Sequence, residues 1–293
     1  MSSGRIFYLI SGPAHLPYLV TSIHSLRERA QFSGEVVVFA WPESYPVAKL
    51  ISLDKSLDIT LKEREPRTRG HNSHFLEKIH LMQEFSGTQG ALFIDADTLP
   101  VEPIIAPFEA LDFGMKMIAV QFSDWTTQKK LIQKRIRTIE HIEDCREEMS
   151  RCFEDYIPSP NNGVLACKSN SKCLARWAKL ATQVYKTTFI PDEVCLHLVV
   201  ASDSFLEEGI MFSGDSGYNT SPKFQHPDLL DTNVKIWHFH GDCHVRPGKS
   251  AKGMGLWLPA FQNCLTKNAG NMDQWFSPPM NKWINALYHD NLL

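Results

Sequence analysis

The sequence predicts an α/β fold, in which strands alternate with helices along the chain. Residues 5–10 form an apolar run, apolar residues follow at helical spacing over 16–29, and a second apolar run covers 35–41. A strand, a helix and a strand in this order predict a βαβ unit. A further apolar run, over residues 91–94, ends in two carboxylates, which is typical of a buried strand that carries polar groups at its carboxyl end.

The remaining elements follow from the same periodicities. Helical spacing predicts helices over 72–85, 127–153 and 171–186 and a helix that begins at Pro191, and the helix 127–153 is the longest in the chain. Pro100 is expected to end the strand that begins at Ala91. Further strands are expected near residues 59–61, 116–122, 164–167 and 234–242, the third of them after a turn at residues 161–163.

Bulk properties limit the class of protein. The 293 residues predict one large domain, and the net charge of -3 argues against a general binder of nucleic acid or of membrane surfaces. The seven cysteines are odd in number and contain no CxxC pair, which favours a reducing compartment and hence a cytoplasmic location. No signal peptide and no transmembrane segment are expected, because the apolar run at the amino terminus is short and no longer run exists.

The strongest candidate for chemistry is the pair Asp95 and Asp97. Two carboxylates at a strand end repel each other unless a cation or hydrogen-bond donors lie between them. A divalent cation that joins them to a diphosphate is the simplest solution. The alternative is that the two acids form a turn or cap the next helix, because Asp-x-Asp alone is a weak pattern.

A third metal ligand can come from the strand that ends in His238 and His240. Alternation puts both imidazoles on one face of the strand, and imidazole is a ligand that Mn²⁺ accepts. A basic, glycine-rich stretch follows, in which Arg246 and Lys249 could hold phosphate oxygens. Arg69 and Lys78 are further candidates for phosphate.

Two more stretches could bind the rest of a substrate. The loop at residues 11–15, which contains Ser11, lies at the ligand edge of the first βαβ unit. Asn161, Asp192 and Glu193 carry amide and carboxylate groups that could hold a polyol. No P-loop, GxGxxG, GxSxG or HExxH motif is present, which disfavours the corresponding nucleotide-binding and hydrolytic sites.

Taken in order, these motifs resemble the family-8 retaining glycosyltransferases, the group of glycogenin and the bacterial lipopolysaccharide galactosyl- and glucosyltransferases. The resemblance covers residues 5 to 250 and is carried by Arg69, Lys78-Ile79, Asp95-Ala96-Asp97-Thr98, Pro160-Asn161-Asn162-Gly163-Val164, Asp192-Glu193 and Trp237-His238-Phe239-His240-Gly241. Two positions depart from the family. Glu193 stands where the family has glutamine, and the family's Lys-Pro-Trp is replaced by a stretch in which His244, Arg246 or Lys249 would supply the basic group. The stretch 127–153 has no counterpart that we can assign.

The resemblance implies a GT-A type fold, with a Rossmann-like nucleotide-binding sheet flanked by helices and a smaller acceptor-side region. It implies a single domain over 1–293, with a nucleotide-binding half at about 1–122, a sugar and acceptor half at about 123–256 and an appendage at about 257–293. Asp95, Asp97 and His238 would bind Mn²⁺ or Mg²⁺, and the spacing of the motif favours His238 over His240. The nucleotide would be held by Asp95, Arg69, Lys78, Arg246 and Ser11, and the reacting sugar by Asp192, Glu193 and Asn161.

The activity that this implies is a hexosyltransferase of class EC 2.4, which moves a hexose from a UDP-sugar to a glycan, lipid-linked or protein acceptor, with retention of configuration. Two other readings stay open. A nucleotidyltransferase that forms an NDP-sugar shares the fold type, although the loop at residues 10–15 lacks the Lys or Arg that it would need. A non-catalytic binder of nucleotide-sugars or glycans is the third. The donor sugar, the acceptor, the choice between retention and inversion of configuration and the oligomeric state do not follow from the sequence.

Overall fold

The structure is a computed structural model, which describes residues 4–52, 54–70, 72–121, 130, 133–154, 157–222, 233–240 and 254–267. The chain divides into two compact units. Unit 1 comprises the described residues of Met1–Ile6, Pro66–Ile94 and Ile105–Asn219, and unit 2 comprises those of Phe7–Glu65, Asp95–Ile104 and Thr220–Leu293. Each unit contains both helices and strands, so the predicted α/β class is confirmed. The predicted halves and the appendage stay predictions.

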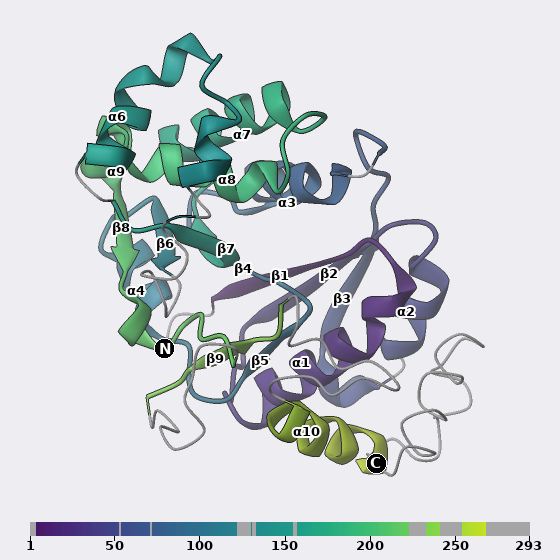
Figure 1. Cartoon of the computed structure of the whole chain (residues 1–293). Helices are drawn as coiled ribbons and strands as arrows, with labels where there is room; N and C mark the ends of the chain where they lie inside the picture. The colour runs from purple at the N-terminus through teal and green to yellow at the C-terminus, as the bar shows by residue number, and fades with distance from the viewer. Residues whose placement is uncertain are drawn as a thin grey trace. The chain divides into compact units, whose positions relative to one another are not determined.

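Unit 2 contains the predicted βαβ region. Its strands follow the order β3-β2-β1, where β1 (Arg5–Ile10) lies mostly in this unit and β2 (Glu35–Ala40) pairs in parallel with β3 (Ile59–Glu63). The helix α1 (Leu16–Glu28) connects β1 to β2, as the periodicity predicts. The unpredicted helix α2 (Tyr45–Ile51) follows β2 and precedes β3 along the chain, and it lies beside these strands (Figure 1). Two 3₁₀ helices, η1 (Pro13–His15) and η2 (Lys55–Leu57), complete this region.

A second, two-stranded sheet in unit 2 joins distant parts of the sequence. Strand β5 (Thr98–Pro100) pairs antiparallel with β9 (Ile236–His238). The strand that begins at Ala91 was expected to continue to Pro100, but it ends at Ile94, and residues 98–100 form the separate strand β5, of which Pro100 is the last residue. A two-stranded sheet consists of edge strands only, and there a residue without an N–H is tolerated. The helix α10 (Met254–Lys267) packs on α1, where the ring centroids of Tyr18 and Trp257 lie 4.9 Å apart.

Unit 1 is built on four strands in the order β4-β7-β6-β8 (Figure 1). Strand β7 (Pro160–Cys167) runs antiparallel to both β4 (Ala91–Ile94) and β6 (Met117–Gln121), and β8 (Gly209–Phe212) runs parallel to β6. Besides the helical residues 133–137, the helices in the described part of this unit are α3 (Ser73–Phe85), α4 (Ala106–Asp112), α6 (Arg146–Glu154), α7 (Lys172–Val184), α8 (Pro191–Val200) and α9 (Asp203–Glu208), with the 3₁₀ helices η3 (Glu143–Cys145) and η4 (Gly214–Ser216).

The turn that was expected at residues 161–163 is wrong, because Asn161, Asn162 and Gly163 all lie inside β7 and are buried. Asn161 can occupy a buried strand because its Oδ1 atom accepts hydrogen bonds from the backbone N–H of Gly163, at 2.9 Å, and from Nδ2 of Asn219, at 2.7 Å. A buried amide costs little once its polar atoms have partners. The polar motif therefore lies within the sheet itself.

The single long helix expected over 127–153 is also wrong within its described part. The helical residues 133–137 are followed by a turn at 138–141, and a new helical segment begins with η3 and continues as α6. The hydroxyl of Thr138 donates to the carbonyl of Arg135, which competes with helical hydrogen bonding. Basic residues precede the turn and acidic residues follow it, as at the end of one helix and the start of the next.

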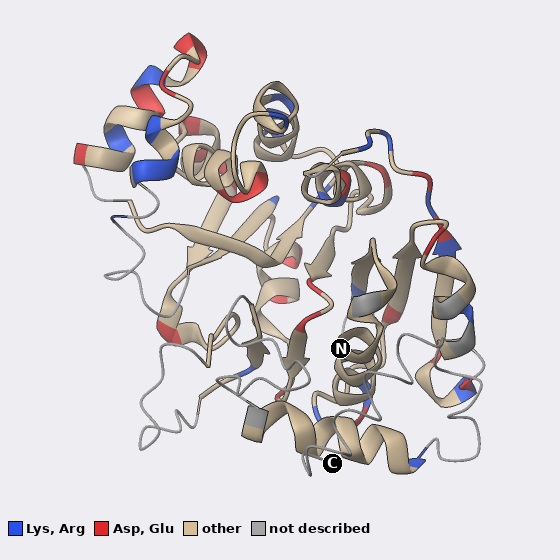
Figure 2. Ribbon diagram, turned by 45° about the vertical axis from the view of Figure 1, so that its right-hand side comes forward, with Lys and Arg blue, Asp and Glu red and all other residues tan. Residues whose placement is uncertain are grey.

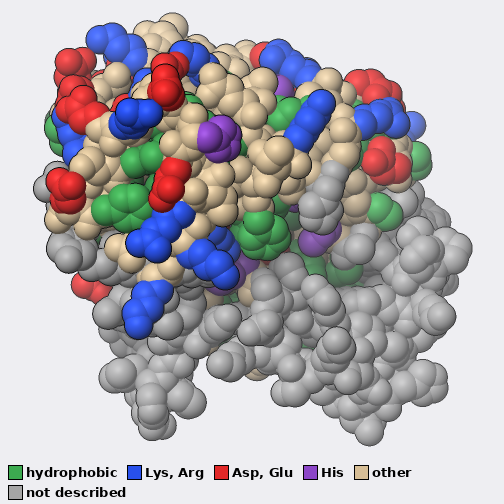
Figure 3. All heavy atoms as spheres, turned by 45° about the horizontal axis from the view of Figure 1, so that its top comes forward, with side chains coloured by type: hydrophobic (Ala, Val, Ile, Leu, Met, Phe, Trp, Pro, Cys, Tyr) green, Lys and Arg blue, Asp and Glu red, His purple; other side chains and the backbone are tan. Residues whose placement is uncertain are grey.

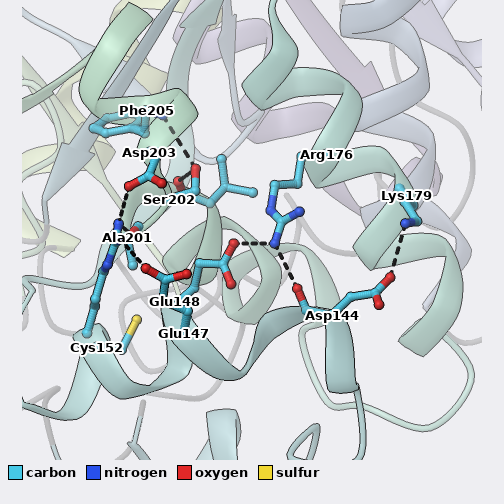
Figure 4. Close-up of polar contacts among 12 residues, drawn as sticks. Asp144, Glu147, Glu148, Cys152, Arg176, Lys179, Ala201, Ser202, Asp203 and Phe205 are labelled. Carbon is cyan, nitrogen blue, oxygen red and sulfur yellow. Dashed lines mark hydrogen bonds and ion pairs between the residues drawn. The ribbon is translucent and has the colours of Figure 1, made fainter.

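Ion pairs hold α6 against its neighbours in unit 1 (Figure 4). Arg176 of α7 pairs with Glu148 and donates to the carbonyl of Asp144, and Arg151 of α6 pairs with Asp203 of α9. Figure 2 shows acidic and basic residues mixed along α6, and both signs are also mixed on the face in Figure 3. The Arg151–Asp203 pair is exposed at Asp203 and contributes little stability, whereas the side chains of Arg176 and Glu148 are largely buried.

The described part of the chain contains no helix that is long and apolar enough to cross a membrane. Six cysteines lie in the described residues, and all six are buried and free of disulfide bonds: Cys145, Cys152, Cys167, Cys173, Cys195 and Cys264.

Candidate active site

The pairing of β5 with β9 builds a cluster of three possible metal ligands within unit 2. Thr98 lies opposite His238 in this register, and the backbone N–H of Phe239 donates to the carbonyl of Asp97 at 2.8 Å. The imidazole Nε2 of His238 consequently lies 3.4 Å from Oδ1 of Asp97 and 3.8 Å from Oδ2 of Asp95. Among the described residues, Asp95, Asp97 and His238 are the one group of this kind, with ligand atoms within 4.8 Å of one another.

This cluster fits a divalent cation. Two ligands of one ion that lie about 2.1–2.3 Å from it can be separated by at most about 4.2–4.6 Å, so a small adjustment of the side chains would close the site around an ion. His238 is 3% exposed, whereas the side chains of Asp97 and Asp95 are 15% and 27% exposed. The carboxylates therefore keep open sides where oxygen atoms of a substrate could complete the coordination.

Hydrogen bonds from neighbouring elements fix the loop that carries the two carboxylates. The hydroxyl of Thr98 lies 2.8 Å from the carbonyl of Asp95, to which it donates, and 3.2 Å from the hydroxyl of Ser22 on α1. The Ser22 hydroxyl is in turn 3.0 Å from that of Tyr8 on β1. The backbone N–H of His238 donates to the carbonyl of Thr220 at 2.9 Å. Both sides of the cluster are thus held by buried groups, as metal sites require.

A buried charged cluster lies within unit 1. The ammonium of Lys78 on α3 is 3.3 Å from Oδ2 of Asp192 on α8 and 3.3 Å from Oδ1 of Asn162 on β7. Asn162 also donates from Nδ2 to Oδ2 of Asp192. The Lys78 ammonium lies over the ring of Phe93, 5.2 Å from its centroid. A buried lysine and a buried aspartate are tolerated here because each offsets the charge of the other.

Glu193 is the second acid of this cluster and pairs with Arg135. Its Oε2 atom is 3.0 Å from Nη1 of Arg135, and both side chains are largely buried. Burial raises the pKa of Glu193 from 4.5 to about 7, against the effect of Arg135, which lowers it; the charge of Asp192 raises it and that of Lys78 lowers it. Glu193 therefore takes up its proton close to neutral pH, which is the range that general acid–base and electrostatic roles use.

The other predicted site residues are placed less specifically. Ser11 is half-buried and follows β1 directly, before η1. Arg69 is exposed, in the segment between β3 and α3. Arg246, Lys249 and His244 lie outside the described residues. The ring of His240 has its centroid 5.1 Å from that of His238, so the expectation that both face the same way agrees with the structure.

Two residues that contact the predicted site residues of unit 1, Arg135 and Asn219, were not predicted from the sequence. Arg135 lies in the single helix that was expected over 127–153, and only the change from basic to acidic residues around position 140 could have shown that this helix ends there. Asn219 follows β8 and η4, and its contact with Asn161 joins positions 58 residues apart. No local sequence pattern predicts a contact between residues so far apart in the chain. Lys78, a candidate for phosphate binding, is itself buried and 5% exposed.

Comparisons with known proteins support the fold. No family model and no curated protein sequence matches the chain. Among solved structures, the LgtC galactosyltransferase in complex with donor and acceptor sugar analogues is 15% identical, with a TM-score of 0.55 over 90% of this chain and 95% of that one. The mouse xyloside xylosyltransferase 1 is 13% identical, with a TM-score of 0.51 over 82% of this chain and 98% of that one.

The bifunctional glycosyltransferase WbbM gives a TM-score of 0.59 at 11% identity, over 90% of this chain. The chain spans 50% of the length of that WbbM structure. All three are described as glycosyltransferases, and identities this low show the fold alone. The α/β fold of this chain is the GT-A type fold of glycosyltransferases.

Proposed function

We propose that the protein is a metal-dependent glycosyltransferase, which moves a hexose from a UDP-sugar donor to a hydroxyl group of a glycan, lipid-linked or protein acceptor. The observation that carries this proposal is the cluster of Asp95, Asp97 and His238, whose ligand atoms lie within 4.8 Å of one another on a GT-A type fold. The similar structures support it, since LgtC is described as a galactosyltransferase in complex with donor and acceptor sugar analogues.

In this proposal Asp97 and His238 bind Mn²⁺ or Mg²⁺, and Asp95 shares the metal with the nucleotide. When bound, the metal would neutralise the negative charge that develops on the UDP leaving group. The residues of the chain orient the ligand set: Thr98 holds the carbonyl of Asp95, and the strand pairing holds His238 beside Asp97. Ser11, Arg69, Lys78 and Arg246 remain proposed contacts of the nucleotide.

For Lys78, the ion pair with Asp192 supports a role near the sugar as well as near phosphate. We assign Asp192, Glu193 and Asn161 to the transferred sugar. Asn161 already uses Oδ1 within the fold, so its Nδ2 is the atom that it would offer to a sugar hydroxyl. Asp192 and Glu193 lie in the first turn of α8, and their carboxylates would accept hydrogen bonds from sugar hydroxyls.

Glu193 would have a different role under each stereochemical outcome. With retention of configuration, the acceptor attacks from the face that the phosphate leaves, and an ionised Glu193 stabilises the oxocarbenium-like transition state. With inversion, a carboxylate has to act as general base. We propose retention. Analysis of the anomeric configuration of the product by NMR tests it.

The experiment that tests the function is release of UDP from a panel of UDP-sugars, with Mn²⁺ and with EDTA. The account predicts metal-dependent release that Asp97→Asn and His238→Ala each reduce by about 100-fold or more, by analogy with the loss of one group from an electrostatic site. If both variants keep full turnover, the assignment is wrong. Release of pyrophosphate from an NTP and a sugar phosphate would instead indicate a nucleotidyltransferase. Calorimetric binding of UDP-sugar without turnover would indicate a non-catalytic binder.

A further inference from the structure

Glu193 and Arg135 form a buried ion pair, and Arg135 belongs to none of the sequence motifs described above. Arg135 belongs to the helical residues 133–137, and Glu193 to the first turn of α8. Their side chains are 14% and 7% exposed, and the atoms Nη1 and Oε2 are 3.0 Å apart. The guanidinium carbon of Arg135 also lies 5.5 Å from the centroid of the Phe189 ring, just before α8. Arg135 therefore contacts the start of α8 at two places.

The backbone at the start of α8 is itself tightly held. Ile190 adopts a left-handed conformation, with φ 52°, which is costly for a β-branched residue and persists only where the surroundings enforce it. The indole N–H of Trp177 donates to the carbonyl of Asp192 at 2.8 Å. Nδ2 of Asn72 donates to the carbonyls of Tyr185 and Thr188. Because the backbone around Glu193 is fixed in this way, the position of its carboxylate depends on its side-chain torsion angles. The ion pair with Arg135 holds those torsion angles.

Charge explains why an arginine is needed here. Glu193 stands where the resembling family has a neutral glutamine, and a buried carboxylate needs a counter-charge that a buried amide does not. Asp192 of α8, Lys78 of α3 and Arg135 are the charged groups that act on Glu193. Lys78 lies 3.3 Å from Asp192. Arg135 comes from the stretch 127–153, which has no assigned counterpart in the family. The positive charge of Arg135 therefore compensates the negative charge that Glu193 introduces in place of the family's glutamine.

We propose that Arg135 is a positioning residue for Glu193, which holds the carboxylate ionised and oriented for sugar transfer. This inference rests on the proposed function, because it assigns Arg135 to the same site. Arg135 need not touch the substrate. It acts through Glu193 alone, so its effect should vanish when Glu193 cannot ionise.

The test is a double-mutant cycle of Arg135→Met and Glu193→Gln, with UDP release measured from pH 5.5 to 9. Arg135 lowers the pKa of Glu193, so its removal should move the acid limb of the wild-type kcat profile to higher pH, by about one unit, and reduce kcat at pH 7 about fivefold. KM should change much less, because Arg135 does not contact the donor. In the Glu193→Gln background the same Arg135→Met substitution should change kcat less than twofold.

Arg137→Met is the matched control, since Arg137 lies two residues further along the same segment, is exposed and has its guanidinium carbon 5.9 Å from the Phe153 ring centroid. It should leave the pH profile in place. Arg135→Lys keeps the charge and should restore part of the activity. If Arg135→Met does not fold, Arg135→Gln takes its place in the cycle. Equal losses in the wild-type and Glu193→Gln backgrounds would overturn the inference, because Arg135 would then act on the fold in general.

A second readout separates this inference from the proposed function. Carboxyl ¹³C NMR follows the titration of Glu193 without any turnover, and its midpoint should rise in Arg135→Met. If wild-type protein releases no UDP from any donor while this midpoint rises, the proposed function fails and the control of Glu193 by Arg135 stands. If wild-type protein is active but the midpoint does not change in Arg135→Met, the inference fails and the proposed function stands.

Discussion

His238 lies opposite Thr98 in the register between β9 and β5, and this pairing brings the His238 imidazole to within 3.4 Å of the Asp97 carboxylate. The two residues are 140 positions apart in the sequence, yet three residue pairs of a small sheet define their relationship. A shift of one residue in that register would turn the imidazole to the other face. The candidate metal site therefore depends on the backbone pairing between β5 and β9.

Removal of one ligand should abolish tight metal binding. Asp97→Asn and His238→Ala are each expected to weaken Mn²⁺ binding by at least about 10- to 100-fold, since changes to the groups around a site already cost that much. Isothermal titration calorimetry measures the affinity directly. Asp112→Asn, at the exposed end of α4, is the matched control and should bind like wild type. Unchanged Mn²⁺ affinity in both ligand variants would rule out this cluster as the metal site.

The support of the metal loop should be detectable through Thr98. Thr98→Val keeps the shape of the side chain but removes the hydroxyl that donates to the Asp95 carbonyl, which should destabilise the fold by about 1–3 kcal/mol. Metal affinity should fall as well, because the backbone at Asp95 loses a fixed partner. Urea denaturation and calorimetry measure the two effects. Thr182→Val removes a hydroxyl bonded to Ala178 within α7 and should leave Mn²⁺ affinity unchanged.

The sequence predicted most elements correctly, because their apolar periodicity is local. The strand at 5–10, the helix at 16–29 and the helix at 72–85 agree with β1, α1 and α3 within a few residues. The errors have nonlocal or competing causes. Asn161-Asn162-Gly163 has the composition of a turn, and only its contact with Asn219 shows how it can be part of a strand. The helix over 127–153 fails because its apolar spacing continues across a turn, which Thr138 and the change of charge sign favour.

The pair of Lys78 with Asp192 should be costly to break from one side. Lys78→Met leaves the buried carboxylate of Asp192 without its nearest counter-charge and is expected to destabilise the fold by about 3–5 kcal/mol. Lys78→Met combined with Asp192→Asn should recover much of that loss, since no charge is then left in excess. Urea denaturation of the single and double variants measures the coupling. If the double variant loses the sum of the two single effects, the two side chains do not interact.

A surface pair of the same type supplies the comparison. Lys179 and Asp144 are 3.2 Å apart, but their side chains are 61% and 63% exposed (Figure 4). Lys179→Met should therefore cost less than about 1 kcal/mol.

Glu193 should make stability depend on pH in a specific direction. Its pKa is raised by burial from 4.5 to about 7 in the folded state, so the folded protein binds this proton more tightly than the unfolded chain does. The contribution of this group to stability is fully present below pH 4.5 and is lost as the pH rises through 7, by up to about 3 kcal/mol. The stability of wild type minus that of Glu193→Gln should fall across this window.

Chemical denaturation at a series of pH values measures this difference. Glu140→Gln, an exposed glutamate on the turn after residues 133–137, is the control variant. A difference between wild type and Glu193→Gln that stays constant from pH 4.5 to 7 would contradict the raised pKa.

The candidate site could be predicted in part for the same physical reasons as the fold. Asp95, Asp97 and His238 were identifiable because each stands at the end of an apolar run, where strand ends place polar groups together. The role of Lys78 as a partner of Asp192 could not be predicted, because it depends on how α3 packs against α8 within unit 1. Arg135 was hidden for the same reason, since its partner Glu193 is 58 residues further along the chain.

The most direct test of the central claim is a crystal structure with UDP and Mn²⁺, with data collected at a wavelength where manganese scatters anomalously. The account predicts one anomalous peak bonded to Asp97 and His238 at about 2.0–2.3 Å, with Asp95 and diphosphate oxygens completing the coordination. A manganese peak elsewhere, with these three side chains free of metal while UDP is bound, would contradict it.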